Sequence, residues 1–282
     1  MRVALWGAWL CLSGTGWAQS TPVLVPPGTW SSAPAPLQAR LFLPNGSGPH
    51  PAVVMVHGCG GAYAKDGSLN ARHRMWGEYL ASQGFVALML DSFTARGIRE
   101  LCTTRHAERT LKEADRVGDA YAALAYLHQQ PGVVAQHIAL LGWSHGGGVV
   151  LDAISQPPKA AQLGFSAAVS FYPGCTVRNK HAERFHPSAP LLVLMGEADD
   201  WMPVAPCKAL TATVAARGEP MEIVTYPDTF HDFDNPGLKG ARKRTDVPNG
   251  VHPGAGVTVA PNASAREDAK RRVVAFLARH LQ

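Results

Sequence analysis

The sequence predicts an α/β protein with a mostly parallel, open β-sheet and helices on both faces. Two patterns support this prediction. Short continuous apolar runs, typical of strands buried on both faces, alternate along the chain with segments of helical periodicity. This alternation favours parallel strands joined by crossover helices. Neither a long linker nor an internal repeat divides the chain, so we expect one domain over residues 37–282.

The expected elements follow one another with short connections. Trp76 and Leu80 share one face of the helix expected over residues 72–83, which Gly84 ends, and Pro131 closes the helix expected over 107–129. Residues 37–44 alternate as an edge strand would. Further strands are expected over residues 51–56, 85–90, 136–141, 165–172, 191–195 and 222–226, and further helices after residue 146 and over 204–217 and 264–281.

Composition narrows the class of protein. The chain has 282 residues, of which 46% are hydrophobic and 17% charged, as in a globular domain, and its formal net charge is +5. Its tightest basic cluster, Lys239, Arg242, Lys243 and Arg244, lies among glycine and proline. A solvated loop explains this cluster better than nucleic-acid binding, which requires a basic face with interleaved aromatic residues.

The N-terminus is typical of a secretory signal peptide. Arg2 is followed by an apolar stretch over residues 3–12, which is too short to span a bilayer. Small residues at Gly16 and Ala18 predict cleavage after Ala18, and an uncleaved anchor is the alternative. We therefore expect a soluble mature protein, exported to the periplasm or secreted. Residues 19–36, rich in proline, serine and threonine, are expected to form an irregular arm.

Cysteine usage agrees with export. Cys11 leaves with the predicted signal peptide, and Cys59, Cys102, Cys175 and Cys207 remain. An even number of cysteines in an oxidising compartment predicts two disulfides. Four cysteines allow three pairings, and cysteine spacing does not choose among them.

The strongest chemical signal is the pentapeptide Gly142-Trp143-Ser144-His145-Gly146. It follows an expected buried strand and precedes residues that can open a helix, which is the strand–turn–helix context of a nucleophile elbow. Glycine is needed on either side because a larger residue would collide with so sharp a turn. Ser144 is therefore the candidate nucleophile.

A serine nucleophile needs a base, and the base needs an orienting acid. Asp199 follows the strand expected over residues 191–195, with Asp200 as its rival; one of the two could instead cap the next helix. His231 follows the last expected strand and is the candidate base, with His252 as the weaker candidate. The order serine, acid, histidine is the one a nucleophile elbow requires.

The tetrahedral intermediate of acyl transfer needs N–H donors for its oxyanion. One candidate donor is the backbone N–H of His145, directly after the nucleophile. The second is the N–H of Cys59, in the glycine-rich loop over residues 57–61. A Cys59 thiol nucleophile is a rival idea, opposed by the serine in the elbow and by the expected oxidation of the cysteines.

Six segments together make the chain resemble the dienelactone hydrolase family of α/β-hydrolases. They are residues 57–61 (HGCGG), 91–97 (DSFTARG), 142–147 (GWSHGG), 171–174 (FYPG), 196–203 (GEADDWMP) and 226–233 (YPDTFHDF). The resemblance implies an open α/β-hydrolase sheet without a large cap, and it favours Asp199 over Asp200. It also implies substrate contact by Arg96. The founding members differ in having a cysteine nucleophile and a second arginine where this chain has Asn235.

The sheet order of α/β-hydrolases, carried over by this resemblance, also implies a disulfide pairing. It places the strands ending at His57 and Asp91 side by side, and likewise those ending near Tyr172 and Gly196. The implied bonds are Cys59–Cys102 and Cys175–Cys207, each bracing a loop beside the site.

These observations predict an exported serine hydrolase of carboxylic esters or lactones that works through an acyl-enzyme, with no metal and no organic cofactor. A peptidase or acyltransferase with the same three residues is the nearest alternative, and a non-catalytic binding protein on the same fold is the distant one. The expected partner is a small-molecule substrate, neither nucleic acid nor membrane. Trp143, Trp201, Tyr63 and Phe93 could line the pocket or pack in the core.

Overall fold

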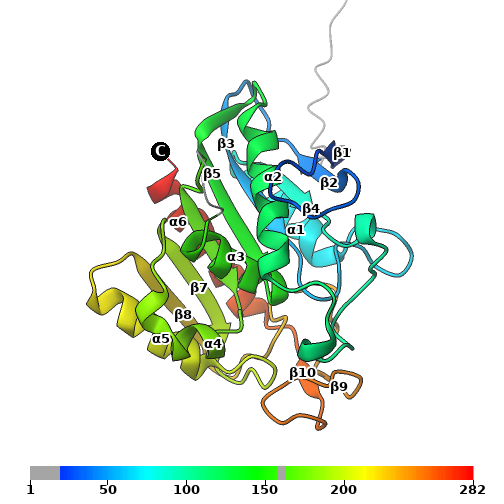
Figure 1. Ribbon diagram of the computed structural model, residues 1–282, viewed down its shortest axis with the longest axis vertical. Helices are drawn as coiled ribbons and strands as arrows, with labels where there is room; N and C mark the ends of the chain where they lie inside the picture. The colour runs from blue at the N-terminus through cyan, green and yellow to red at the C-terminus, as the bar shows by residue number, and fades with distance from the viewer. Residues whose placement is uncertain (1–19, 158–162, 282) are drawn as a thin grey trace, which may run out of the picture.

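The computed structural model describes residues 20–157 and 163–281, so the predicted signal peptide lies outside the described residues. An eight-stranded sheet runs through the molecule and carries helices on both faces (Figure 1). This is the predicted α/β architecture, and within residues 20–157 and 163–281 no large cap covers it. Among the described helices, none combines the length and hydropathy that crossing a bilayer requires.

The sheet has the strand order β1-β2-β4-β3-β5-β6-β7-β8. From β4 to β8 all neighbouring strands pair in parallel, whereas β2 is antiparallel to both β1 and β4. The central strands are buried on both faces, which explains their continuous apolar sequences. The bounds are β1 Thr21–Val25, β2 Leu37–Phe42, β3 His50–Val56, β4 Val86–Leu90, β5 Val133–Trp143, β6 Ala167–Phe171, β7 Leu191–Gly196 and β8 Met221–Tyr226.

Helices cover the sheet on two sides. Helices α2 (Val117–His128) and α3 (His145–Ser155) pack on β5 from one face, and α1 (Ala71–Ser82) and α6 (Ala263–His280) pack from the other (Figure 1). Helix α5 (Val204–Ala216) packs beside β8, and the short α4 (Thr176–Lys180) contacts α5. This layering leaves the carboxyl ends of the parallel strands open, which is where ligands bind in such sheets.

Two expectations near the N-terminal half were wrong. Residues 21–25 are not irregular but form strand β1, which pairs with β2 from Thr21↔Leu41 to Val25↔Leu37. This pairing occupies the backbone hydrogen-bonding groups on the outer side of β2. Consequently β1, not β2, is the edge strand. The helix expected over residues 107–129 begins only at Val117. Residues 98–113, the entrance loop, instead extend beyond the sheet and form only a short 3-10 turn at His106–Glu108.

The basic cluster near the C-terminus is also more ordered than expected. Arg242–Arg244 forms β9, which pairs with β10 (Val257–Val259) in a hairpin. The hairpin and the entrance loop lie next to each other beyond the carboxyl ends of the strands (Figure 1). A second, smaller apolar cluster joins them. Its members are Cys59, Phe93, Leu101, Cys102, Leu111, Trp201, Val247, Val257 and Val259.

Candidate active site

Ser144 sits on a sharp turn between β5 and α3. Its backbone has φ 53° and ψ −114°, a conformation that residues other than glycine seldom adopt, and its N–H donates to the Phe171 carbonyl at 2.9 Å. A Cβ at Gly142 would lie 2.3 Å from the Gly146 carbonyl oxygen, and one at Gly146 would lie 2.2 Å from the Val56 carbonyl oxygen. Both glycines are therefore required by close backbone packing.

His231 and Asp199 form a buried pair. Nδ1 of the imidazole lies 2.7 Å from Oδ2 of the carboxylate. The other carboxylate oxygen accepts hydrogen bonds from the backbone N–H groups of Trp201, at 2.9 Å, and Met202, at 2.8 Å. Burial alone would lower the pKa of the His231 imidazole, but the charge and hydrogen bond of Asp199 outweigh it, so the pKa lies above 6.5.

The neighbours of the His231 imidazole connect it to the elbow. Nε2 is buried, and no hydrogen bond within the described residues occupies it. The imidazole packs on the ring of Tyr172, with centroids 4.4 Å apart, and on the indole of Trp201, at 4.7 Å. Tyr172 directly follows the residue that holds the Ser144 amide, and Trp201 lines the same hollow as Ser144. The free nitrogen is thus available to a hydroxyl at the strand ends.

Asp200 and His252, the alternative candidates for the acid and the base, lie outside the His231–Asp199 pair. Asp200 accepts hydrogen bonds from the backbone N–H of Thr258, at 2.6 Å, and from its hydroxyl, at 2.9 Å, and so ties the hairpin to the loop after β7. His252 is exposed at the tip of the hairpin. The structure therefore brings Asp199, and not Asp200, to the imidazole of His231.

A buried polar network behind His231 was missed by the sequence reasoning. The fully buried carboxylate of Asp234 accepts hydrogen bonds from Trp76 Nε1 at 2.7 Å, Trp143 Nε1 at 2.8 Å and the Tyr172 hydroxyl at 2.5 Å. Asp232 pairs with Arg72. These bonds hold the loop that carries His231 against the strand ends. The sequence signal that could have indicated this network is the pair Asp232 and Asp234, directly after His231.

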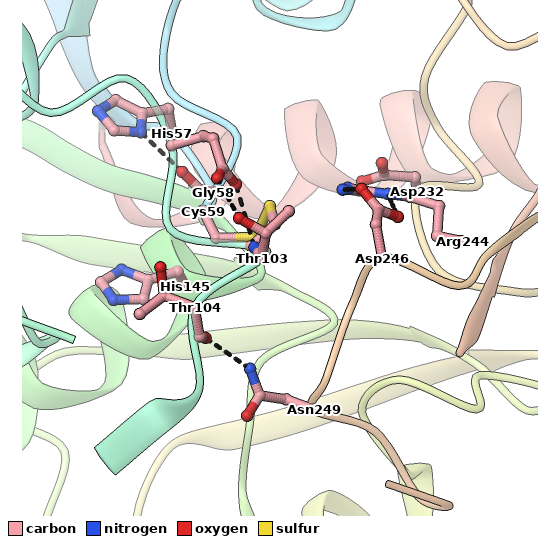
Figure 2. Close-up of a disulfide and its surroundings, with 12 residues drawn as sticks. His57, Gly58, Cys59, Thr103, Thr104, His145, Asp232, Arg244, Asp246 and Asn249 are labelled. Carbon is pink, nitrogen blue, oxygen red and sulfur yellow. Dashed lines mark hydrogen bonds and ion pairs between the residues drawn. A yellow bond between two sulfur atoms is a disulfide. The ribbon is translucent and has the colours of Figure 1, made fainter. Parts of the chain in front are cut away.

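The two candidate oxyanion donors flank Ser144. A Cβ at Gly58 would lie 3.4 Å from Cβ of Ser144, so the loop over residues 57–61 packs directly against the elbow. Within the described residues no hydrogen bond occupies the N–H of Cys59. His145 is the first residue of α3, where N–H groups have no partner inside the helix. Figure 2 shows the residues of this loop beside His145.

Two disulfides brace this edge of the sheet. They join Cys59 to Cys102, with Cα atoms 5.0 Å apart, and Cys175 to Cys207, with Cα atoms 5.1 Å apart. These are the pairs that the resemblance implied. The first bond ties the loop over residues 57–61 to the entrance loop (Figure 2). A disulfide-bonded Cys59 has no thiolate to offer, which removes it as a nucleophile.

Two side chains from the segment before α2 hold the side chain of His145. Its Nδ1 lies 2.9 Å from Nη1 of the fully buried Arg116, and its Nε2 lies 3.9 Å from a carboxylate oxygen of Glu113. Burial lowers the pKa of the His145 imidazole to about 3. The ring is therefore neutral, and Nδ1 accepts the hydrogen bond from Arg116. Both partners come from the segment expected to be helical, so their approach was not predicted.

Three expected pocket residues lie elsewhere. Arg96 is not free for substrate, because its guanidinium pairs with both oxygens of Asp119 at 2.8 and 2.9 Å. Trp143 is fully buried in the core, where it stacks on Phe171. Phe93 is buried against the imidazole of His57, with ring centroids 4.3 Å apart. The core positions of Trp143 and Phe93 follow from the apolar residues that surround them.

Trp201 does line the site. It borders a small hollow of about 10 Å³ that also contains Ser144, Cys59 and His145. This hollow shares the walls Arg109, Glu113, Gly174, Trp201 and Met202 with a cleft of about 920 Å³ between the entrance loop, α4 and the hairpin. Within residues 20–157 and 163–281, no three His, Cys, Asp or Glu side chains are grouped as metal ligands. The hollow at Ser144 therefore lies at the end of a large cleft.

A parallel sheet in this strand order, with a serine on a strained turn between its central strand and the following helix, defines the α/β-hydrolase class. Within that class the chain belongs to the dienelactone hydrolase family, whose model matches residues 37–281. Membership of this family makes the protein a hydrolase.

Similar proteins agree with this placement. A Bradyrhizobium protein named as a probable 2-oxo-3-(5-oxofuran-2-ylidene)propanoate lactonase is 26% identical over 205 residues, which are 69% of this chain and 78% of the relative. A Klebsiella pneumoniae structure assigned to the dienelactone hydrolases has a TM-score of 0.69 at 18% identity and covers 92% of this chain and 98% of that one.

Two further solved structures share the fold. Thermogutta terrifontis esterase 2, phosphorylated by paraoxon, has a TM-score of 0.66 at 19% identity, over 94% of this chain and 95% of that chain. Porphyromonas gingivalis dipeptidyl peptidase 4 has a TM-score of 0.65 at 19% identity, over 94% of this chain but only 36% of that chain. At these identities the structures establish a common fold.

Proposed function

We propose that this protein hydrolyses carboxylic esters or lactones through an acyl-enzyme formed on Ser144. The observation that carries the proposal is the buried 2.7 Å pair of His231 and Asp199 at the strand ends beside the serine elbow. Its second imidazole nitrogen has no other partner within the described residues. Family membership and the lactonase relative support an ester or lactone as the substrate class.

In the proposed reaction the Ser144 hydroxyl attacks the carbonyl carbon while Nε2 of His231 takes its proton. Asp199 keeps Nδ1 protonated and stabilises the imidazolium that forms. The negative oxygen of the tetrahedral intermediate accepts hydrogen bonds from the N–H groups of Cys59 and His145. The imidazolium then protonates the leaving alcohol. Water, activated by the same imidazole, releases the acid and restores the serine.

We also propose that residues 1–18 are removed and that the mature enzyme acts in the periplasm or outside the cell. The two disulfides support an oxidising location. N-terminal sequencing of enzyme recovered from the exported fraction should begin at Gln19. Recovery of the intact N-terminus in a membrane fraction would instead support an uncleaved anchor.

A fluorophosphonate probe, followed by hydrolysis of p-nitrophenyl esters, tests the proposed chemistry. Wild-type enzyme should be labelled at Ser144 and should release p-nitrophenol, and Ser144→Ala should lose both signals while keeping its melting temperature. An unlabelled wild type would favour a non-catalytic binding protein. Labelling without turnover of esters or lactones, but with turnover of peptide amides, would favour a peptidase, the class to which the Porphyromonas gingivalis structure of the same fold belongs by name. Labelling with transfer of the acyl group to an added alcohol in place of water would favour an acyltransferase.

A further inference from the structure

Arg109 is a buried cation without a carboxylate partner among the described residues. It is 6% exposed and comes from the entrance loop. Its Nε donates to the Thr104 carbonyl at 3.3 Å, and its Nη1 lies 3.1 Å from Nδ1 of His106. Both partners are neutral acceptors, since burial and the nearby Arg109 charge lower the pKa of the His106 imidazole. The remaining nitrogen, Nη2, makes no hydrogen bond within the described residues.

Three other largely buried arginines are neutralised within the fold. Arg72 pairs with Asp232, Arg96 with Asp119 and Arg178 with Asp152. Arg116 also lacks a carboxylate partner, but it lines neither the hollow at Ser144 nor the cleft. Among the described residues, the charges of Glu113 and Glu100 act on Arg109 only from beyond ion-pairing distance. Because a buried charge is costly unless it is paired, Arg109 is the arginine in the site that can take a direct ionic partner from outside the chain.

Arg109 lies between the cleft and the hollow that contains Ser144. It lines both the hollow that contains Ser144 and the cleft of about 920 Å³, so it lies at their junction. Hydrogen bonds fix the position of Arg109. The Thr104 carbonyl that holds its Nε also accepts from Asn249 Nδ2 at 2.9 Å, which fixes the entrance loop to the hairpin (Figure 2).

The cleft itself combines positive charge with apolar surface. Lys112 lines it with Arg109, whereas the charges of Arg178 and Arg184 are matched by Asp152 and Glu183. The remaining carboxylate, Glu113, lies 3.9 Å from Nε2 of the neutral His145 ring, and its charge also acts on Arg109. Val177 and Val251, two large hydrophobic residues exposed to 69% and 42%, border the same cleft. The hollow at the serine, by contrast, has room for about one water molecule.

We propose that the cleft binds the larger part of an ester, that this part is apolar with a negatively charged group, and that Arg109 pairs with that group. This inference rests on the proposed ester hydrolysis. A carboxylate, sulfonate or phosphate has the acceptor geometry that a guanidinium fork recognises. Val177 and Val251 contact the apolar portion of the substrate. The small hollow limits the size of the group on the other side of the scissile bond.

Matched esters test the pairing on either side of the scissile bond. One pair is 4-acetoxybenzoate and its neutral methyl ester, and the other is the p-nitrophenyl monoester of adipic acid and its methyl ester. In at least one pair, wild-type kcat/KM should favour the anion by about tenfold to a hundredfold, the range of a charge-assisted hydrogen bond. The preference should shrink with added salt. The sulfonate and phosphate analogues of the preferred anion then identify the favoured group.

Variants assign the preference to one residue. Arg109→Gln should bring the anion-to-neutral ratio close to one, and Arg109→Lys should restore part of it. Arg105→Gln, an exposed arginine of the same loop that does not line the cleft, should leave the ratio unchanged. If Arg109→Gln proves unstable, competitive inhibition of wild type by the anionic product, relieved by salt, replaces it as the readout.

Three results would overturn the inference. They are equal turnover of anionic and neutral esters by wild type, a preference for the anion that survives in Arg109→Gln, and a preference for cationic esters, which would point to Glu113 instead. If the wild-type enzyme hydrolysed no ester at all, neutral or anionic, this result would refute the proposed function rather than the role of Arg109.

Discussion

Removing the Cys59–Cys102 disulfide should destabilise the protein measurably. The bond closes a loop of 43 residues. In the chain-entropy treatment, such a closure removes about 13 cal/mol/K from the unfolded state, which corresponds to about 4 kcal/mol at ~25 °C. For a domain of this size the Cys59→Ala/Cys102→Ala variant should melt about 8–16 °C lower than wild type. The same treatment gives about 3.7 kcal/mol for the 32-residue loop of Cys175–Cys207.

The assay is equilibrium unfolding in urea or, where refolding is incomplete, calorimetric melting at a fixed scan rate. The two double variants should lose similar stability, but the first should lose more kcat, because Cys59 carries a proposed oxyanion donor. Its KM should change less than its kcat. A loss below about 1 kcal/mol in both variants would show that the loops are held by packing and not by the cross-links. Equal kcat in wild type and in Cys59→Ala/Cys102→Ala would refute the link between this bond and the oxyanion site.

Further predictions concern the proposed chemistry and the elbow. Asp199→Asn should lower kcat on the order of 10⁴-fold because the imidazole loses its orienting charge, whereas Asp200→Asn should lower it far less; equal losses in steady-state assays would contradict the assignment. Since His231 must be neutral to accept a proton and its pKa lies above 6.5, kcat/KM should fall about tenfold per pH unit below that pKa and level off above it; a profile flat to about pH 5 would exclude His231 as the base. Gly142→Ala should cost about 3 kcal/mol of unfolding free energy, because its Cβ would meet the Gly146 carbonyl; an unchanged melting curve would contradict that packing.

The central architecture was predictable from the sequence because its strands are buried on both faces. Continuous apolar runs such as residues 51–56 admit little else, and the helices between them end at clear signals such as Gly84. The expectation for residues 107–129 failed because its first half has helical periodicity but belongs to the entrance loop. There Leu111 is buried in the second apolar cluster, which also contains Trp201, and this tertiary packing overrides local propensity.

The candidate site divides in the same way. Ser144, Asp199 and His231 could be proposed from the sequence because each follows a strand at the same edge of the sheet, and their order along the chain restricts the choice. Arg96 was assigned by resemblance, and its pairing with Asp119 depends on a helix whose register the sequence does not reveal. Arg109 could not be identified, because neither its burial nor its missing partner leaves a trace in local sequence.

The β9–β10 hairpin has a consequence for how this enzyme can diversify. Val259 bridges to His231 in parallel pairing, the N–H of Ala260 donates to the His231 carbonyl at 3.2 Å, and Thr258 holds Asp200. Substitutions that reshape the hairpin therefore also disturb the backbone of the proposed base. No such tie is found between α4 and His231 within the described residues. Evolution and engineering toward new substrates should accordingly accumulate changes in α4 first, while the hairpin stays nearly invariant among active descendants.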